Sequence, residues 1–451
     1  MTVAFSKTRF EPSSPVNDIV TEDSAAVSFV EQHGNELRFC HSSGAWFRFN
    51  GVTWQRDQTG IAFQWARELA RKLAEDQDER KRYITHKTAF ASGVERFAKV
   101  DPKIAVTIEY WDADPWLLGT PAGTVDLRTG LLRDSLQDDG ITKSTAVAPL
   151  QEDCLRWLRF LSETTGDDAE LIRFLQQWCG YSLTGLTREH ALVFVYGPGG
   201  NGKSVFLNVV ASILKDYGTT AAMDTFNASH GDRHPTDLAM LRGARLVTAS
   251  ETEEGRAWAE SRIKQMTGGD RISARFMRQD FFEFTPQFKL MIVGNRKPVL
   301  RNVDDAARRR FLIVPFERKP ETPDRELEQK LMREAPGILR WMIEGCLDWQ
   351  ANGLAKPASV LAATEEYFSD QDLFAHWLAE ECLCEPGNMD KSETSAGLFK
   401  SWKDFAVSAG HTSGTRQSFA DQMARHGFRY YRGRKTREFF GITLKPKAGF
   451  H

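Results

Sequence analysis

Four continuous apolar segments of strand length occur in the central part of the chain, at residues 191–196, 246–250, 289–294 and 311–315. A strand that is buried on both faces of a parallel sheet has this continuous pattern. Stretches with the apolar spacing of helices lie between the four segments. Strands that alternate with helices predict an α/β fold around a parallel sheet, which we place over residues 191–360.

The segment before this region has the pattern of two helices. Apolar residues recur at helical spacing over residues 155–161 and 171–178, and a Thr-Gly-Asp-Asp turn separates the two stretches. We therefore predict a helical collar over residues 151–190, which leads into the first strand.

The N-terminal part mixes strand and helix patterns. Residues 46–54 alternate large and polar side chains around an Asn-Gly turn, which predicts a β-hairpin, and residues 61–74 have helical spacing. Residues 119–130 are rich in turns, with room for short strands. We predict an α+β accessory domain over residues 27–150, preceded by a flexible polar tail over residues 1–26.

The C-terminal part, residues 361–451, has the pattern of a winged helix. Amphipathic helices are predicted at residues 373–383, 395–407 and 416–426, and a hairpin with a basic turn at residues 428–444. This hairpin is a candidate to contact DNA phosphates. The alternative is that its charges only keep an edge hairpin soluble. The basic residues in question are Arg432, Arg434, Lys435 and Arg437.

Composition narrows these possibilities. The formal net charge of the 451 residues is −2, so positive charge for nucleic-acid binding must be concentrated locally. The six cysteines show no zinc-site spacing, which favours buried free thiols in a reducing compartment. No apolar run reaches the length of a membrane span, and the N-terminus lacks the apolar segment of a secretory peptide. These features predict a soluble, cytoplasmic protein.

The first apolar strand ends in a glycine-rich loop that precedes a helical run over residues 205–214. Glycines let backbone amides turn inward around phosphates, and the helix N-terminus adds the positive end of its dipole. Lys203 would supply a cation for the β- and γ-phosphates, and the Ser204 hydroxyl would ligate Mg²⁺. The pattern predicts an ATP and Mg²⁺ site formed by Gly197, Pro198, Gly199, Gly200, Asn201, Gly202, Lys203, Ser204 and Val205.

Polar residues follow the next two strands of the predicted sheet. Glu251 comes directly after residues 246–250 and is a candidate to ligate Mg²⁺ or to polarise the attacking water, with Glu253 as the second candidate for water activation. Asn295 follows residues 289–294 and is placed to hydrogen-bond the γ-phosphate and the water. The alternatives are a solvated acidic loop and an ordinary turn asparagine.

Three consecutive arginines, Arg308, Arg309 and Arg310, precede the last apolar strand. In a ring of subunits, an arginine at this place reaches the γ-phosphate bound by the neighbouring subunit and stabilises charge in the transition state. The alternative is a solvated basic turn. Arg310, next to the strand, is the first candidate for this arginine finger, and Arg309 is the second.

These motifs, in this order, resemble those of the superfamily III helicases, in particular the phage and plasmid primase-helicase family that includes satellite-phage and poxvirus replication proteins. Residues 264–278, which contain Thr267-Gly-Gly-Asp270, are similar to a motif that generic phosphate-loop proteins lack. Residues 112–115 and 123–130 are similar to the family's domain before the helicase, so the resemblance extends over roughly residues 30–445.

The resemblance implies a P-loop AAA+-like core, a hexameric ring that uses Mg·ATP, and 3′ to 5′ movement on DNA. It also implies a β-hairpin that grips single-stranded DNA, at about residues 273–284 here, with Arg275 and Arg278 as its basic residues and Lys264 just upstream. Cations on a loop that ATP turnover moves suit this role. The aromatic residues Phe276, Phe281 and Phe282 are candidates to stack on bases. For at least two of them we expect core packing instead.

Two departures from the family pattern matter. Glu251 is followed by Thr252 rather than by a second carboxylate, so Glu251 and Glu253 both remain candidates for the catalytic role. No third carboxylate or histidine accompanies Asp112 and Asp114, so we interpret that pair as structural and the chain as lacking a primase domain.

The sequence therefore predicts an ATP-dependent DNA helicase of phage or mobile-element replication. Its expected partners are single-stranded and forked DNA, further copies of the chain, and a separate primase or other replisome protein, with no membrane. The alternative is an ATP-regulated DNA-binding replication initiator that separates no strands. A remodelling ATPase of the same fold is disfavoured by the Thr-Gly-Gly-Asp motif.

Overall fold

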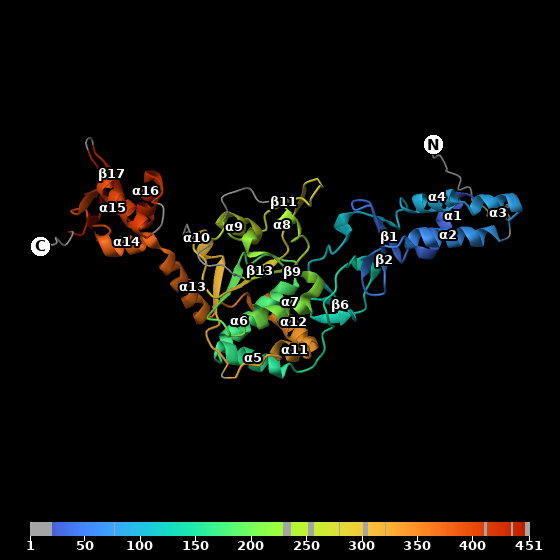
Figure 1. Ribbon diagram of the computed structural model, residues 1–451, viewed down its shortest axis with the longest axis horizontal. Coiled ribbons are helices and arrows are strands. Elements are labelled where there is room, and N and C mark those ends of the chain that lie inside the picture. Colours follow the sequence, from blue (N-terminus) through green and yellow to red (C-terminus); the bar gives the residue numbers. More distant parts are fainter. Residues whose placement is uncertain are drawn as a thin grey trace, which may run out of the picture.

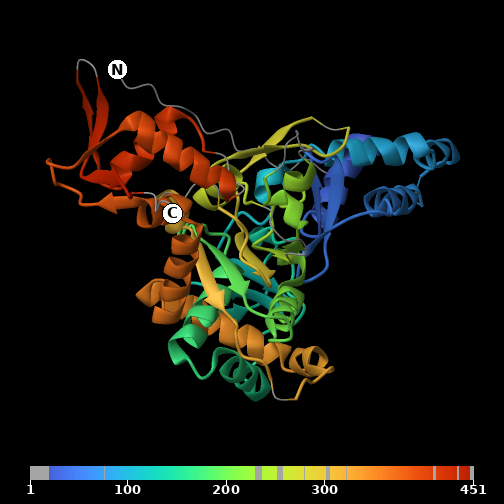
Figure 2. The same cartoon turned by 60° about the vertical axis from the view of Figure 1, so that its left-hand side comes forward.

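The computed structural model describes residues 20–75, 77–228, 236–250, 257–278, 280–300, 305–320, 322–409, 413–433 and 436–446. Figure 1 shows three parts in chain order: a group of N-terminal helices and strands at one end, a central α/β region, and C-terminal helices at the other end. Figure 2 shows the same three parts after rotation, with the central sheet between layers of helices.

A five-stranded parallel sheet forms the centre, as the apolar segments predict. Its order is β14-β8-β13-β10-β9, and each neighbouring pair is parallel. The edge strand β9 has only three residues and lacks the apolar pattern that would predict a strand. The strands are β8 (Leu192–Tyr196), β9 (Gly218–Thr220), β10 (Leu246–Ser250), β13 (Lys289–Gly294) and β14 (Phe311–Pro315).

The two faces of the sheet are buried in two separate cores. In β8, Val193 and Val195 face one core, and Leu192 and Phe194 face the other. Helices cover both faces, which explains why the strands are apolar on both sides. The first core includes α5 (Leu155–Thr165), α6 (Ala169–Leu183), α7 (Lys203–Leu214), α11 (Leu327–Met332) and α12 (Ala335–Asn352); the second includes α8 (Thr236–Ala239), α9 (Glu260–Gly268), α10 (Asp305–Arg308) and α13 (Ala358–Gln371).

The N-terminal part has its own core and a four-stranded sheet of order β3-β2-β1-β4. The predicted tail over residues 1–26 extends too far, because Thr21 caps a helix that begins at Glu22 and buries Ala25 and Ala26. The elements are α1 (Glu22–His33), β1 (Leu37–Cys40), β2 (Ala45–Phe49), β3 (Trp54–Arg56), α2 (Ile61–Ala74), α3 (Glu79–Thr85), α4 (Thr88–Ala98) and β4 (Ala105–Val106).

A small antiparallel sheet joins this part to the centre. It consists of β5 (Leu117–Thr120), β6 (Gly123–Asp126) and β7 (Leu131–Arg133). Although we predicted these residues within the accessory domain, Leu118, Val125 and Leu127 pack into the central core. Short 3-10 helices are η1 (Ile108–Tyr110), η2 (Gln137–Asp139), η3 (Lys215–Tyr217) and η4 (Met223–Thr225).

The C-terminal part is a separate module of three helices with short strands. Its core begins at Phe374, whereas Tyr367 and Phe368 of α13 pack in the central region. The packing boundary therefore lies near residue 372 rather than at the predicted residue 361. The elements are α14 (Leu373–Glu381), β15 (Cys382–Cys384), β16 (Ser392–Thr394), α15 (Ser395–Ser408), α16 (Arg416–Arg425), β17 (Arg429–Arg432), β18 (Arg437–Phe440) and β19 (Ile442–Leu444).

Two expectations from composition meet the structure here. Within the described ranges, no helix combines the length and the apolar character needed to cross a bilayer. All six cysteines are free, and five of them are buried, but Cys384 is exposed.

Candidate nucleotide site and nucleic-acid surfaces

The predicted phosphate loop connects the end of β8 to the start of α7. Lys203 is only 5% exposed, and its Nζ donates hydrogen bonds to the carbonyl oxygens of Gly197 at 2.6 Å and Pro198 at 3.3 Å and to Asn201 Oδ1 at 2.8 Å. Removal from water lowers the pKa of this lysine. The ammonium group is thus held by uncharged oxygen atoms, which a charged phosphate oxygen would replace with a stronger hydrogen bond.

Glycine is required at several points of this loop. Gly197, Gly200 and Gly202 have φ values of +155°, +81° and +85°. A Cβ at Gly197 would lie 1.9 Å from the Phe316 carbonyl oxygen, and one at Gly202 would lie 2.7 Å from the Phe160 ring. A Cβ at Gly200 would meet nothing within 4 Å. The loop is therefore closed against the protein at both ends and open in the middle, where phosphate groups would approach.

Asn295 lies at the same edge of the sheet as the phosphate loop. Gly294, the last residue of β13, pairs with Tyr196, the last residue of β8, so the residues that follow the two strands emerge side by side. Asn295 is exposed there, as is Ser204 in the first turn of α7. The fold thus brings Lys203, Ser204 and Asn295 to one edge, although they come from separate parts of the sequence.

The predicted carboxylates Glu251 and Glu253 lie outside the described residues. The strand that precedes them, β10, ends at Ser250, which pairs with Val293 of β13. Their roles in ligating Mg²⁺ and activating water stay predictions. Elsewhere along the described chain, no group of three or more His, Cys, Asp or Glu side chains is arranged to hold a metal ion.

The three arginines before β14 differ in their surroundings. Arg308 forms an ion pair of 3.1 Å with Glu365 and lies over the Phe368 ring. The part-buried Arg310 donates from Nη1 to the Ala306 carbonyl oxygen at 2.8 Å, so it is engaged within its own subunit. Arg309 is exposed. Arg309, the second candidate from the sequence, is thus the exposed one of the three, and the choice of the finger stays a prediction.

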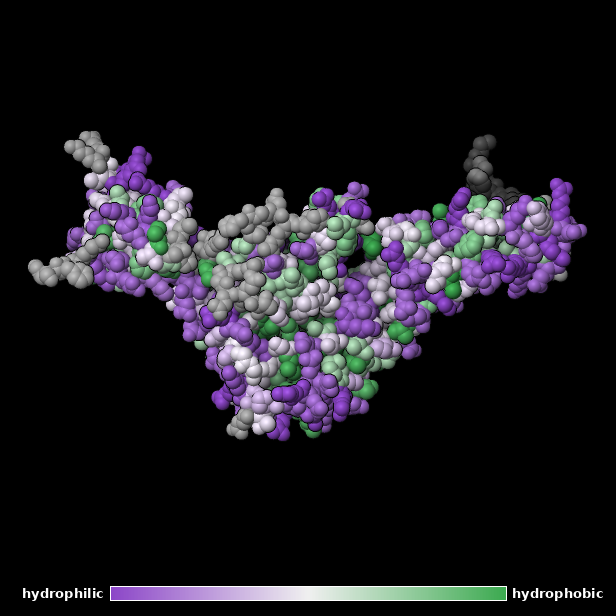
Figure 3. Space-filling view, in the orientation of Figure 1, coloured by the Kyte–Doolittle hydropathy of each residue, from purple (hydrophilic) through white to green (hydrophobic). Residues whose placement is uncertain are grey.

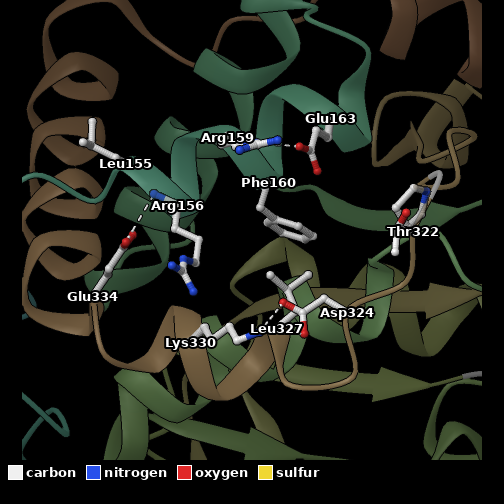
Figure 4. A pocket seen from close by; sticks show the side chains of 11 residues that line it. Leu155, Arg156, Arg159, Phe160, Glu163, Thr322, Asp324, Leu327, Lys330 and Glu334 are labelled. Atoms are coloured by element: carbon white, nitrogen blue, oxygen red, sulfur yellow. Dashed lines mark hydrogen bonds and ion pairs between the residues drawn. The ribbon is translucent and has the colours of Figure 1, made fainter.

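A pocket of about 610 Å³ lies between α5 and α11 (Figure 4). The Phe160 ring points into it and also lies against Gly202 of the phosphate loop. Arg159 pairs with Glu163, and Lys330 with Asp324, on its walls. No local pattern indicates this pocket, because two segments far apart in the chain line it: Leu155, Arg156, Arg159, Phe160 and Glu163 from one, and Pro320, Thr322, Asp324, Leu327, Lys330 and Glu334 from the other.

The predicted DNA-gripping hairpin is present as an antiparallel pair, β11 (Ile272–Ala274) and β12 (Phe282–Phe284). The Arg275 guanidinium lies 4.7 Å from the centre of the Phe281 ring, and Arg278 is exposed with φ at +61°. Our expectation that at least two of the three aromatic residues pack in the core is wrong, because the turn projects beyond the sheet: Phe276 is 38% and Phe281 is 60% exposed.

Lys264 is separate from this hairpin. It lies on α9, upstream of β11, and is half-buried. It is therefore less accessible than Arg278, and its predicted contact with DNA remains a prediction.

The basic hairpin of the C-terminal module is also present, and β17 and β18 pair directly. Arg432 and Arg437 are cross-strand partners, and both are exposed. Like charges directly opposite each other destabilise a strand pair unless an anion lies near them. Tyr430 is 48% exposed beside these cations, while Arg434 and Lys435 lie outside the described residues. Figure 3 shows hydrophilic and apolar residues interspersed over the visible face of the C-terminal module.

Two further cations lie at the opposite edge of the central sheet, and sequence reasoning missed them. Lys289 Nζ is held by the carbonyl oxygens of Thr184, Leu186 and Gln287, and burial lowers its pKa well below the ordinary value. Arg245 donates to the carbonyl oxygens of Leu183 and Leu117 at 2.6 and 2.8 Å. Both side chains are buried, and both connect preceding segments to the sheet.

The predicted interpretation of Asp112 and Asp114 agrees with their contacts. Asp112 accepts hydrogen bonds from the backbone amide and the hydroxyl group of Thr142. Asp114 forms an ion pair of 2.6 Å with Arg128. Both carboxylates thus hold loops of the linking region together.

Comparison with known proteins gives a consistent class. Residues 26–166 match the family described as "D5 N terminal like", and residues 195–310 match a "Family of unknown function (DUF5906)". The fold is similar to that in "The A form apo structure of NrS-1 C terminal region-CTR", with a TM-score of 0.52 and 11% identity over 94% of this chain and 99% of that one. This similarity shows a shared mixed α/β fold with a parallel sheet.

Two viral proteins are related in sequence. "Putative helicase L207/L206" of Acanthamoeba polyphaga mimivirus is 23% identical over 321 residues, and "Putative helicase 121R" of Invertebrate iridescent virus 3 is 29% identical over 240 residues. The matches cover 65% and 49% of this chain, which spans only 33% and 25% of those relatives. Over parts of its length, the chain is thus similar to the D5 N-terminal family and to viral proteins named as putative helicases.

Proposed function

We propose that the chain is the motor part of an ATP-dependent DNA helicase of superfamily III. The observation that carries this proposal is the edge of the parallel sheet where Lys203, Ser204 and Asn295 meet. A strand that ends in a glycine loop with positive φ values, followed by a helix N-terminus, suits a triphosphate. The sheet with helices on both faces supports an AAA+-like core.

Within this site each group has a distinct task. Loop amides and Lys203 would hold the β- and γ-phosphates, and Ser204 with Glu251 would hold Mg²⁺, which neutralises phosphate charge when bound. Glu251 or Glu253 would accept a proton from the attacking water, and the Asn295 amide would orient that water. The pocket beside Phe160 and Gly202 is the candidate place for the base and sugar, since it adjoins the loop.

We infer a ring of subunits from the arginines, and the resemblance to superfamily III helicases implies that this ring is a hexamer. An isolated chain has little use for an exposed Arg309 two residues before the strand β14. Across an interface, its guanidinium would reach the γ-phosphate of the adjacent subunit and stabilise the charge of the transition state.

The two basic hairpins would contact DNA in different ways. Arg275 and Arg278 on the hairpin of the motor suit the backbone of a single strand, and the exposed Phe276 and Phe281 offer faces for base stacking. The opposed Arg432 and Arg437 of the C-terminal module suit duplex phosphates. We expect movement in the 3′ to 5′ direction during replication of a phage or mobile element.

A strand-separation assay on forked DNA with Mg·ATP tests the proposal. The unsubstituted chain should separate the strands, and Lys203→Ala should not. Lys215→Ala is the matched control, because Lys215 lies just beyond the other end of the same helix and its side chain is 55% exposed. If the chain binds DNA but hydrolyses no ATP, the replication initiator without strand-separating activity replaces the helicase.

A second comparison assigns the hairpins. Replacing Arg275 and Arg278 by alanine should abolish strand separation and leave DNA-independent hydrolysis intact. Arg271→Ala is a suitable control, because that arginine pairs with Glu283 at the base of the same hairpin. Loss of basal hydrolysis in the double variant would give the two arginines a structural role instead.

A further inference from the structure

The helix α13 lies against the segment that follows β13. This sensor segment, residues 295–300, begins with Asn295 at the proposed nucleotide site and ends at Leu300, which is buried. The sequence separates α13 from the sensor segment by about sixty residues, so no local pattern linked the two. Their contacts involve both charged and uncharged groups.

The charged contact is near the start of the sensor segment. Lys297 forms an ion pair of 3.2 Å with Glu366, and its Nζ lies 4.5 Å from the centre of the Tyr196 ring. The Lys297 side chain is only 13% exposed, whereas that of Glu366 is 66% exposed. Glu366 thus covers a cation that sits beside the last residue of β8, directly before the phosphate loop.

The uncharged contacts hold the second half of the segment. The Tyr367 hydroxyl donates to the Pro298 carbonyl oxygen and accepts a hydrogen bond of 3.0 Å from Trp258 Nε1. Gln371 Oε1 accepts from the Leu300 amide at 3.1 Å. Tyr367 is 1% exposed, so water cannot readily take over these contacts.

The same helix also holds the segment that carries the candidate arginine finger. Glu365 pairs with Arg308, and the Thr364 hydroxyl accepts from the Ile313 amide of β14 at 3.0 Å. Arg309 lies between these two attachment points in the sequence. One helix therefore contacts both segments that would act on the γ-phosphate, and its side-chain hydrogen bonds and ion pairs with other described residues lie outside the phosphate loop.

We propose that Tyr367 and Gln371, assisted by Glu366, are positioning residues for ATP hydrolysis that act through the sensor segment. This inference rests on the proposed function. Tyr367 and Gln371 fix the backbone at Pro298 and Leu300, and thereby the place at which Asn295 meets the water and the γ-phosphate. They do not touch the loop that would bind the nucleotide. Their loss should therefore slow the hydrolytic step and leave nucleotide affinity unchanged.

Steady-state hydrolysis by the full chain tests this. Tyr367→Phe and Gln371→Ala should each lower kcat by roughly 2- to 10-fold, the effect of one net hydrogen bond, with KM for ATP unchanged. Gln371→Glu should restore kcat, because it keeps an acceptor for the Leu300 amide. The matched control is Asp370→Asn, which removes one charge from an exposed position of the same helix and should behave like the unsubstituted chain.

Hydrogen exchange of the sensor segment provides a readout that does not need activity. The amides of residues 295–300 should exchange faster in Tyr367→Phe and Gln371→Ala than in Asp370→Asn. The inference is overturned if both variants keep kcat and exchange, or if kcat and thermal stability fall while KM for ATP rises. If the unsubstituted chain hydrolyses no ATP, the proposed function is lost as well, whereas unchanged kcat in active variants removes only the positioning role.

Discussion

The two edges of the central parallel sheet each bury a lysine among oxygen atoms, yet the two sites differ in access. At the carboxyl edge, Lys203 contacts three oxygens of a glycine loop whose middle is open. At the amino edge, Lys289 contacts three carbonyl oxygens of the segments around it and is fully enclosed. The kind of partner is the same at both edges.

The difference distinguishes a lysine that we propose to bind phosphate from a lysine that holds the fold together. A buried ammonium group needs hydrogen-bond partners in either case. At Lys203 the partners belong to a loop that a phosphate can approach, so they can be exchanged. At Lys289 they belong to the connection between α6 and β8, together with Gln287, and exchange would break the fold. Accessibility of the partners, rather than burial of the lysine, marks the site.

The largest expected effect comes from making the same change at both edges. Lys203→Met should lower ATP hydrolysis on the order of 1000-fold, since it removes a positioned cation from the transferring phosphoryl group. Its thermal midpoint should fall less than that of Lys289→Met, because one of the three oxygen partners belongs to the exposed residue Pro198. Lys289→Met should keep nucleotide affinity, as measured with a fluorescent ATP analogue. Equal loss of hydrolysis in both folded variants would break the comparison.

The next effect concerns the neighbour's contribution to the carboxyl edge. Arg309→Ala should lower hydrolysis on the order of 100-fold, the effect of one positioned donor in a transition state. Mixing Arg309→Ala subunits with Lys203→Met subunits should restore part of the activity, because some interfaces then combine an intact loop with an intact arginine. Arg310→Ala should lower thermal stability and show no such rescue. The absence of rescue for Arg309 would exclude it as the finger.

Lys289, at the amino edge of the sheet, should make the stability of the fold depend on pH. Burial lowers the pKa of Lys289 in the folded chain well below its ordinary value of 10.5. At pH values between this lowered pKa and 10.5, the unfolded chain therefore binds more protons than the folded chain. The contribution of Lys289 to stability therefore rises with pH in that window. Denaturant titrations should show that Lys289→Met loses this rise and is less stable by about 2 kcal/mol at alkaline pH, where three carbonyls lack a donor. A parallel pH profile in both proteins would refute the assignment.

An ordinary ion pair should contribute less to the unfolding free energy than Lys289 does among its carbonyl partners. Arg173 on α6 forms two hydrogen bonds with Asp348 on α12 and lowers the pKa of that carboxyl group to about 2. Its contribution is present above about pH 4 and lost as pH falls toward 2. Asp348→Asn should lower the unfolding free energy by about 1 kcal/mol at neutral pH, given its partial exposure. Glu344→Gln removes the ion pair between Glu344 and Arg340 on the same helix and should not measurably change the unfolding free energy.

Local sequence was sufficient for the parts that depend on local chemistry. The strand and helix on either side of the glycine loop, the other three apolar strands and the helix at Ile61–Ala74 all form where the patterns predicted them. The exposed aromatic residues of the motor hairpin were predicted wrongly, because apolar character alone cannot tell a projecting turn from a packed one. The edge strand β9, with three small polar residues, had no apolar signal.

Contacts between distant segments lay beyond the sequence. Lys289 reads as the first residue of an apolar strand, and its carbonyl partners at Thr184 and Leu186 lie over a hundred positions upstream. The choice between Arg309 and Arg310 likewise needed the local geometry, since only the fold shows which guanidinium is engaged by its own subunit. The pairing of Tyr367 with Pro298 belongs to the same class.

Asp372 is the junction between the central region and the C-terminal module. This residue ends α13 and also caps α14, whose Ala375 amide it accepts at 2.9 Å. His426 of the module lies 4.0 Å away. Only Asp372 lies between α13, which packs on the central region, and α14, the first helix of the C-terminal module. Under the proposed function, a pull on DNA bound to the β17–β18 hairpin would therefore be transmitted through Asp372 and α13 to the proposed nucleotide site.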